Sequence, residues 1–351
     1  MMKKRAWIIG WFAIVAIALI LIGKFVYTVD PYFHYHKPYT DRYYYILNNQ
    51  RSQNDGISKY FEYDALITGT SMTENFKVTQ FNELFERNSI KIPFAGGSFK
   101  EIDDNIERAL KYNSDVQIIL RGLDYGEILS DSEKMRYESY PEYLYDDNIF
   151  NDYKYLLNKD VIIKGLGAIA YYTLTKRETT SFDEYSSWDF GFGKEKVLSQ
   201  YKRIEKIDKE FSLTEEDKKI IDENIEKNVL DLPKKYPNIK FIYFITPYSI
   251  VYWDSLNQKG EVEKQIMAEK YMIEKILEIP NIELYSFFNN YDIICDLDNY
   301  KDAGHYMGKI NEKILEWISK KEYLLTKDNY QEYINKNLEF YKNYDYDKIY
   351  E

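Results

Sequence analysis

The chain has 351 residues, of which 45% are hydrophobic and 30% charged. This length suits a single α/β domain that carries an insertion and an anchor, and the composition excludes wholesale disorder. The formal net charge of −11 argues against a nucleic-acid partner, because phosphate binding needs a basic surface. Cys295 is the only cysteine, so the chain can form neither an intrachain disulfide nor a Cys-x-x-Cys metal or redox site.

The N-terminus has the pattern of a membrane anchor. Lys3, Lys4 and Arg5 precede an apolar run from Ala6 to Gly23, and apolar character resumes up to Val29. This run can span a bilayer, which takes about 20 helical residues, and no small-x-small cleavage site follows it. Because positive charge stays in the cytoplasm, we expect a single-pass type II signal anchor with the rest of the chain outside. A buried core helix is the weaker interpretation.

After the anchor, short β-branched runs alternate with amphipathic stretches, which is typical of parallel strands joined by crossover helices. The predicted strands are Asp64–Gly69, Ile90–Ala95, Val116–Leu120, Ile239–Thr246 and Ile282–Phe287. The clearest predicted helices are Phe99–Tyr112, Glu261–Ile279 and a segment that a capping box opens at Thr214. The pattern predicts a doubly wound, flavodoxin-like α/β sheet of about five strands, with ligands at the carboxyl ends of the strands.

The predicted organisation has four parts. Residues 1–28 form the cytoplasmic stub and anchor, residues 29–60 a juxtamembrane segment, and residues 61–320 the α/β domain. A long insertion at about 125–195 lacks a clear period and is the expected source of substrate specificity. The tail from 321 to 351 is polar and rich in tyrosine, and its pattern assigns it no role.

Ser71 is the candidate nucleophile. The first predicted strand runs into Thr68-Gly-Thr-Ser71, which places a hydroxyl at a tight strand-to-helix turn where helical N–H groups can hold an oxyanion. An ordinary helix N-cap explains the same residues when they are considered alone.

Asp302 and His305 are the candidate partners of Ser71. Their Asp-x-x-His spacing lets the carboxylate orient the imidazole while the ring faces a nucleophile. The motif alone is also compatible with a surface turn, but it follows the last predicted strand whereas Ser71 follows the first. His305 is one of three histidines and the only one within the α/β domain. The combined pattern favours a functional triad.

Other residues follow strands at the same edge of the predicted sheet. The Gly96-Gly97 pair would let N–H groups approach an oxyanion, with a plain turn as the alternative. Substrate-binding candidates are Arg121, Asp124, Tyr248 and Trp253 at this edge, and His34 and His36 in the segment after the anchor. An ion pair is the alternative for the two charged residues, and core packing for the two aromatic ones.

These segments together resemble the SGNH (GDSL) hydrolase superfamily over about Tyr63 to Lys320. More narrowly, the anchor, the Gly-x-Ser turn and the terminal Asp-x-x-His resemble DltD-type and alginate-acetylation-type proteins. The resemblance implies Ser71 as nucleophile, His305 as general base and Asp302 as its orienting partner, with the Ser71 and Gly97 N–H groups as the oxyanion hole. It also implies a cell-envelope polymer as substrate and a membrane-bound O-acyltransferase as partner. The superfamily's Gly-x-Asn-Asp block reads Gly122-Leu-Asp124 here, and a carboxylate cannot donate to an oxyanion.

Three functions follow from this interpretation. The leading one is O-acyl transfer, of acetyl or D-alanyl type, to an envelope polysaccharide or teichoic acid through an acyl-Ser71 intermediate, shielded from water by the insertion and by His34 and His36. The alternatives are a carbohydrate O-acyl esterase with the same triad and a catalytically silent envelope scaffold. We expect no cofactor and no metal, since no cluster of His, Cys and acidic residues has ligand spacing.

Overall fold

The computed structural model describes residues 2–136 and 140–351, so Met1 and residues 137–139 of the predicted insertion lie outside the described residues. The chain divides into two compact units. The first comprises residues 1–61 and 139–181, and the second residues 62–138 and 182–351. The predicted insertion therefore contributes to both units, and the C-terminal tail belongs to the second.

The second unit is built on a six-stranded sheet in the order β2-β1-β3-β4-β5-β6, of which only β6 is antiparallel to its neighbour. The strands are β1 (Ala65–Gly69), β2 (Ser89–Pro93), β3 (Ile118–Leu123), β4 (Lys240–Ile245), β5 (Ile282–Ser286) and β6 (Leu324–Leu325). The five predicted strands are confirmed as a parallel sheet, because each is a short apolar run that is buried almost throughout. The two-residue β6 was not predicted.

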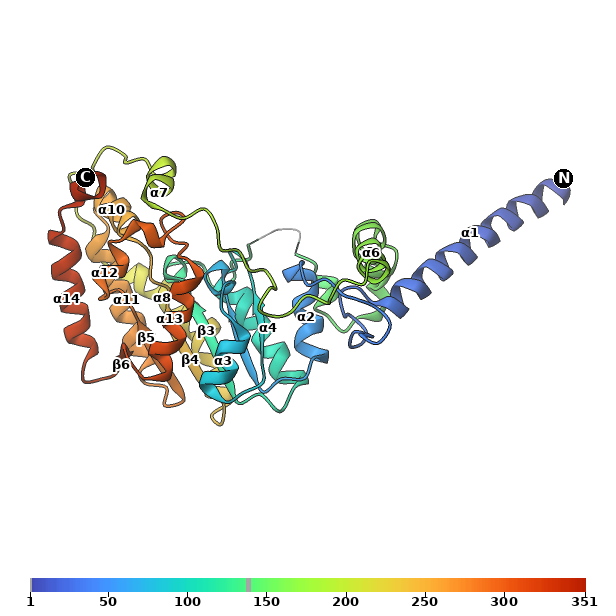
Figure 1. Ribbon diagram of the computed structural model, residues 1–351, viewed down its shortest axis with the longest axis horizontal. Helices are drawn as coiled ribbons and strands as arrows, with labels where there is room; N and C mark the ends of the chain where they lie inside the picture. The colour runs from blue at the N-terminus through green and yellow to red at the C-terminus, as the bar shows by residue number, and fades with distance from the viewer. Residues whose placement is uncertain (1, 137–139) are drawn as a thin grey trace. The chain divides into compact units, whose positions relative to one another are not determined.

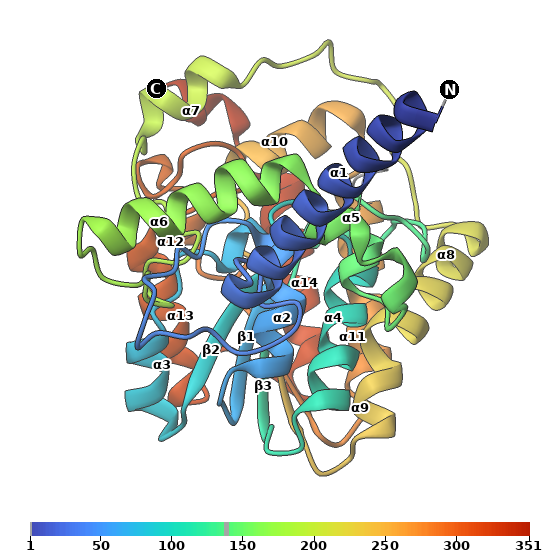
Figure 2. The same cartoon turned by 90° about the vertical axis from the view of Figure 1, so that its right-hand side faces the viewer.

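Helices cover both faces of this sheet (Figures 1 and 2). α3 and α13 pack together on one face, whereas α4, α8 and α11 lie with the π-helix η6 on the other. The longer helices are α3 (Val78–Phe85), α4 (Phe99–Tyr112), α7 (Lys194–Gln200), α8 (Glu215–Ile225), α10 (Ile250–Lys259), α11 (Val262–Ile276), α13 (Gly308–Ser319) and α14 (Tyr330–Asn343). The shorter ones are η1 (Ser71–Thr73), η2 (Tyr125–Glu127), η6 (Glu226–Leu230), α9 (Asp231–Lys235), α12 (Tyr291–Ile294), η7 (Leu297–Asn299) and η8 (Tyr346–Tyr350).

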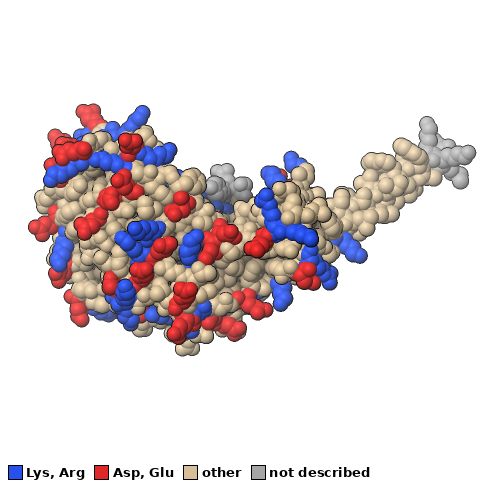
Figure 3. All heavy atoms as spheres, viewed as in Figure 1, with Lys and Arg blue, Asp and Glu red and all other residues tan. Residues whose placement is uncertain are grey.

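Capping residues set where two of the predicted helices begin. Ser98 and Glu101 form a reciprocal capping box at the start of α4, and Thr214 and Asp217 form another at the start of α8. On the face shown in Figure 3, acidic and basic side chains are interspersed over the second unit.

The first unit contains α1 (Met2–Val29), an apolar helix whose Arg5–Val29 portion is long enough to cross a membrane. It also contains α2 (Gln50–Tyr60), η3 (Glu142–Leu144), η4 (Ile149–Asn151), α5 (Tyr153–Leu156), the π-helix η5 (Val161–Leu166) and α6 (Gly167–Leu174). α5 and η5 pack against α1. The predicted helical anchor is thus present as a helix of the required length and hydrophobicity.

Glu269 joins α14 to the sheet. This fully buried carboxylate accepts hydrogen bonds from Tyr333 of α14 at 2.6 Å and from Tyr125 at 2.9 Å, while Ser286 at the end of β5 lies 3.5 Å away. Burial raises the pKa of Glu269 to about 7, and these hydrogen bonds only partly oppose the shift. The C-terminal helix is therefore fixed to the core through a buried acid.

Replacing Glu269 with Gln should change how stability depends on pH. Because folding raises the pKa from 4.5 to about 7, the folded state keeps a proton that the unfolded state releases in this window. The free energy of unfolding of the wild type should therefore fall as the pH rises from 4.5 to about 7. Chemical denaturation of the full-length protein in detergent at pH values on either side of the window should show a fall smaller by about 1–3 kcal/mol in the Gln variant.

The matched control is Glu278→Gln, whose side chain is 67% exposed. It should keep the pH dependence of the wild type. If Glu269→Gln also kept the pH dependence of the wild type, ionisation of Glu269 would not be what destabilises the folded state.

Candidate active site

Ser71 lies at the carboxyl end of β1, where the chain turns sharply. Gly69 has φ +151°, and a Cβ atom there would lie 2.5 Å from Cγ2 of Thr73, so only glycine fits this turn. The N-cap of the following 3₁₀ helix is Thr70, whose hydroxyl accepts a hydrogen bond from the Met72 N–H. Ser71 is therefore not the cap, and its hydroxyl is left for another partner.

That partner is His305, whose Nε2 lies 2.8 Å from Oγ of Ser71. The other ring nitrogen, Nδ1, lies 2.8 Å from Oδ2 of Asp302. The Asp302 carboxylate also accepts the N–H groups of Gly304 and His305, both at 2.9 Å, which fixes its position. With Nδ1 protonated toward Asp302, Nε2 can accept the Ser71 proton. The structure thus brings together the three residues that the sequence predicts.

Electrostatic interactions between Asp302 and His305 favour a charged pair. Burial raises the pKa of Asp302, but hydrogen bonds from His305 and Gly304 outweigh it and hold the value at about 2. Burial likewise lowers the pKa of His305, yet the hydrogen bond and charge of Asp302 overcome it and raise the pKa above 6.5, with smaller effects of Asp124 and Glu74. An imidazole with a raised pKa binds a proton taken from Ser71 more firmly.

Asp124 and Tyr248 lie beside this hydrogen-bonded triad, as predicted for residues that follow β3 and β4. Oδ2 of Asp124 accepts a 2.8 Å hydrogen bond from the hydroxyl of Thr70, next to Ser71. Tyr248 donates to the other carboxylate oxygen. A Cβ atom at Gly304 would lie 3.3 Å from the Tyr248 ring. Direct contact of either residue with a substrate stays a prediction.

Trp188 and Glu74 belong to the same surroundings, and the sequence did not single them out. The Trp188 ring packs edge-on against His305 with centroids 5.3 Å apart. Its Nε1 donates to Glu74 at 2.5 Å, and its backbone N–H donates to the side chain of Asn75 at 2.8 Å. Trp188 comes from the predicted insertion, so the aromatic content of that segment was the only signal for it.

Lys91 is a second residue that the sequence did not single out. Its ammonium group is fully buried and donates to the backbone carbonyls of Glu74 and Phe76, the latter at 3.1 Å. Burial lowers the pKa of Lys91 to about 7. A lysine within an otherwise apolar predicted strand was the available signal. The side chain holds the segment that follows Ser71.

Three predicted site residues are corrected by the structure. Arg121 is fully buried and pairs with Asp103 at 2.9 Å, so it forms a core ion pair and does not meet substrate. Trp253 is also fully buried and stacks on Tyr341 with centroids 3.8 Å apart, so the packing alternative holds.

The third correction concerns the oxyanion hole. The Gly97 N–H donates to the carbonyl of Phe94 at 2.7 Å, which closes a turn, so this donor is not free for an oxyanion. Within residues 2–136 and 140–351, no group accepts the N–H of Ser71. Ser71 is therefore the predicted oxyanion donor that the structure leaves available.

His34 and His36 belong to the first unit and have partners there. His34 Nε2 lies 3.4 Å from Asp152, and the His36 ring contacts the carbonyls of Lys37 and Tyr27 at 2.7 and 3.0 Å. Their predicted role beside the substrate stays a prediction. Nowhere in the described part of the chain do three His, Cys, Asp or Glu residues gather as a metal site.

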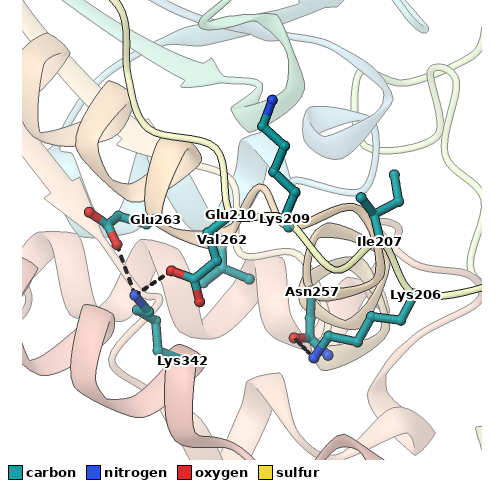
Figure 4. Close-up of a pocket in the computed structure, with 9 residues that line it drawn as sticks. Lys206, Ile207, Lys209, Glu210, Asn257, Val262, Glu263 and Lys342 are labelled. Atoms are coloured by element: carbon teal, nitrogen blue, oxygen red, sulfur yellow. Dashed lines mark hydrogen bonds and ion pairs between the residues drawn. The ribbon is translucent and has the colours of Figure 1, made fainter.

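A cavity of about 60 Å³ in the second unit lies near α10, α11 and α14 (Figure 4). Lys342 at its edge forms ion pairs of 2.9 and 2.8 Å with Glu210 and Glu263. None of the triad residues lines this cavity, and its two carboxylates are already paired with Lys342. It does not compete with Ser71 as the candidate site.

The fold and the site together define a mixed α/β chain with a hydrogen-bonded Ser-His-Asp arrangement at the carboxyl edge of a mostly parallel sheet. Comparison with models of known protein families and with curated protein sequences finds no match to this chain.

The charge of Asp302 should control the protonation of His305. In an NMR titration of protein labelled at histidine, the imidazole of His305 should titrate above pH 6.5. In Asp302→Asn the midpoint should fall, because an amide does not stabilise the imidazolium by charge.

Single substitutions of His34 and His36 by Gln would assign the three histidine signals. Asp298→Asn, at an exposed carboxylate of the same segment, is the matched control and should leave the His305 midpoint in place. Equal midpoints in wild type and Asp302→Asn would show that the pair is not coupled in solution.

Proposed function

We propose that this protein is a membrane-anchored, SGNH-type serine acyltransferase that acts outside the cytoplasm. The observation that carries the proposal is the continuous hydrogen-bonded chain from Ser71 Oγ through His305 to Asp302, at 2.8 Å for each link. Such a chain at the carboxyl edge of a parallel sheet supports nucleophilic catalysis, whatever the fold family.

In the proposed reaction, Oγ of Ser71 attacks the carbonyl carbon of an ester or thioester while its proton passes to Nε2 of His305. The tetrahedral intermediate places negative charge on the former carbonyl oxygen, near the Ser71 N–H. As it collapses, the bond to the leaving group breaks, and His305 returns the proton to the departing oxygen or sulfur. An acceptor hydroxyl then attacks the acyl-Ser71, again giving its proton to His305, and the acyl group leaves on the acceptor.

The proposed setting comes from α1 and from the resemblance described above. Arg5–Val29 lies in one helix and contains an 18-residue stretch of mean hydropathy 2.6, which supports a single span. Its basic N-terminus supports a cytoplasmic start and an external catalytic unit, as in a type II protein. The resemblance suggests an acetyl or D-alanyl group, an envelope polysaccharide or teichoic acid as acceptor, and a membrane-bound O-acyltransferase as partner.

One observation favours an esterase as the second candidate. The side chains of His305 and Asp302 are 36% and 34% exposed, so water can reach the triad unless an acceptor covers it. Water in place of the acceptor hydroxyl would make the same intermediate hydrolytic. The 2.8 Å contact between Ser71 and His305 gives no support to a catalytically silent scaffold.

A fluorophosphonate probe should label the full-length wild-type protein in detergent, because it reacts with an activated serine. Labelling should disappear in Ser71→Ala and drop by at least about 10³-fold in His305→Ala, since the serine then lacks its base. Ser199→Ala, at an exposed serine of α7, is the matched control and should be labelled as wild type is. A folded wild type without labelling would refute serine catalysis.

Aryl acetate turnover should distinguish transfer from hydrolysis. A transferase should release about one equivalent of phenolate per protein and then slow, because the acyl-Ser71 waits for an acceptor. Added oligosaccharide should raise the steady rate and appear as acylated product in mass spectrometry. A steady rate that is fast without oligosaccharide and insensitive to it would identify the esterase.

A further inference from the structure

The first unit contains an apolar groove beside α1. Its cavity of about 680 Å³ lies between the later part of α1 and the segment that includes η4 and α5. α1 contributes Leu19, Ile20, Gly23, Lys24 and Tyr27, and the other wall is Ile149, Phe150, Asp152, Tyr153, Leu156 and Leu157. The two walls are in close contact, because a Cβ atom at Gly23 would lie 3.8 Å from Cβ of Leu156.

The segment from 149 to 174 exposes large apolar side chains. Phe150 is 86% exposed, Leu174 83% and Ile149 73%, and Ile163, Tyr153 and Tyr171 are each more than half exposed. Soluble surfaces rarely gather apolar side chains in this way unless something covers them. Within the same segment, Lys154, Lys159 and Lys164 are exposed, which gives it the mixed character of an interfacial element.

The position of the groove along α1 points to lipid. Lys24 is the first charged residue after Arg5, and the stretch between them is about 28 Å long at 1.5 Å per residue, close to the thickness of a hydrocarbon core. Ile20 and Leu19 precede Lys24 by four and five residues, so they lie about 6–8 Å deeper than Lys24. Side chains that share a groove with Leu19 and Ile20 are then at the depth of the outer acyl chains.

Buried polar contacts fix α5 to the end of α1. Asp30 is fully buried directly after α1 and accepts a 2.7 Å hydrogen bond from the hydroxyl of Tyr155 in α5. The same carboxylate accepts the N–H groups of Tyr35 and His36 at 2.7 and 3.1 Å. The Tyr155 hydroxyl in turn accepts the N–H of Tyr32 at 3.0 Å. A segment held in this way cannot move away from the membrane while α1 spans it.

We propose that residues 149–174 insert into the outer leaflet of the bilayer and that an acyl chain of a membrane lipid occupies the groove between α1 and α5. The proposal rests on the membrane anchor of the proposed function. Lipid is the expected occupant because one wall of the groove is the spanning helix itself, and the neighbours of that helix in a bilayer are acyl chains. Exposed lysines of the segment would then meet the phosphate groups of lipids.

The test uses full-length protein in phosphatidylcholine and phosphatidylglycerol vesicles. Cys295 is replaced by Ser, and single cysteines are introduced at Phe150, Leu174, Ile14 and Lys219 for a polarity-sensitive fluorophore. Ile14 in the middle of α1 reports the anchor, and Lys219, a 71% exposed residue of α8, is the control outside the segment. Circular dichroism checks that each variant is folded, and nitroxide-labelled lipid is the quencher.

We expect a blue-shifted emission that nitroxide lipid quenches at Ile14, Phe150 and Leu174, and an unquenched, unshifted emission at Lys219. Quenching at Ile14 with a water-like, unquenched emission at Phe150 and Leu174 would overturn the inference and leave the anchor intact. A blue-shifted but unquenched emission at Phe150 would show that protein covers the segment, and would also overturn it. Loss of quenching at Ile14 would refute the anchor itself, and the inference with it.

Discussion

The need to bring the carboxyl ends of β1 and β5 into one site constrains much of the second unit. Ser71 follows β1 and His305 follows β5, but β3 and β4 lie between these strands in the sheet. At about 4.8 Å per strand, the segment after β5 must return across about 14 Å of the sheet edge to reach Ser71. The hydrogen bonds along that path are therefore part of the site.

The path can be followed contact by contact. The hydroxyl of Tyr300 donates to the carbonyl of Pro247 beyond β4 at 3.1 Å, and the N–H of Ser249 donates to the carbonyl of Ala303 at 2.9 Å. On the far side, Tyr306 and Asn311 donate to the carbonyl of Met72 at 3.2 and 2.9 Å. The loop that carries Asp302 and His305 is thus attached before and after these residues, which gives a preorganised triad.

The sheet and the triad could be predicted because both depend on local pattern and strand order. Buried parallel strands are short apolar runs, and their carboxyl ends share an edge, so Ser71 and the Asp302–His305 pair had to approach each other. Arg121 and Trp253 were misassigned because an edge position in the sequence does not say on which side of the sheet a side chain lies, and both point into the core. The role of Trp188 depends on how an irregular segment folds back, which no periodicity encodes.

The two-residue β6 and the division into units escaped prediction for a related reason. β6 pairs antiparallel with β5 through only Leu324 and Leu325, too short a run to give an alternating pattern. The first unit combines residues 1–61 with 139–181, segments far apart in the chain. Their association depends on contacts such as Tyr155 with Asp30, in which one buried acid satisfies donors from both segments. A single sequence shows each of these two segments but does not show that they pack together.

The charges around His305 have opposite effects on two steps of the proposed reaction. Asp302, Asp124 and Glu74 all raise the pKa of the imidazole, which favours transfer of the proton from Ser71. The same carboxylates disfavour an oxyanion, because like charges close together in the site repel each other. The imidazolium that forms on His305 offsets part of this cost. Because the Gly97 N–H is bonded to the carbonyl of Phe94, the Ser71 N–H is the predicted donor that is left to offset the rest of this cost. A site balanced in this way favours substrates or partners that supply their own hydrogen-bond donor to the oxyanion.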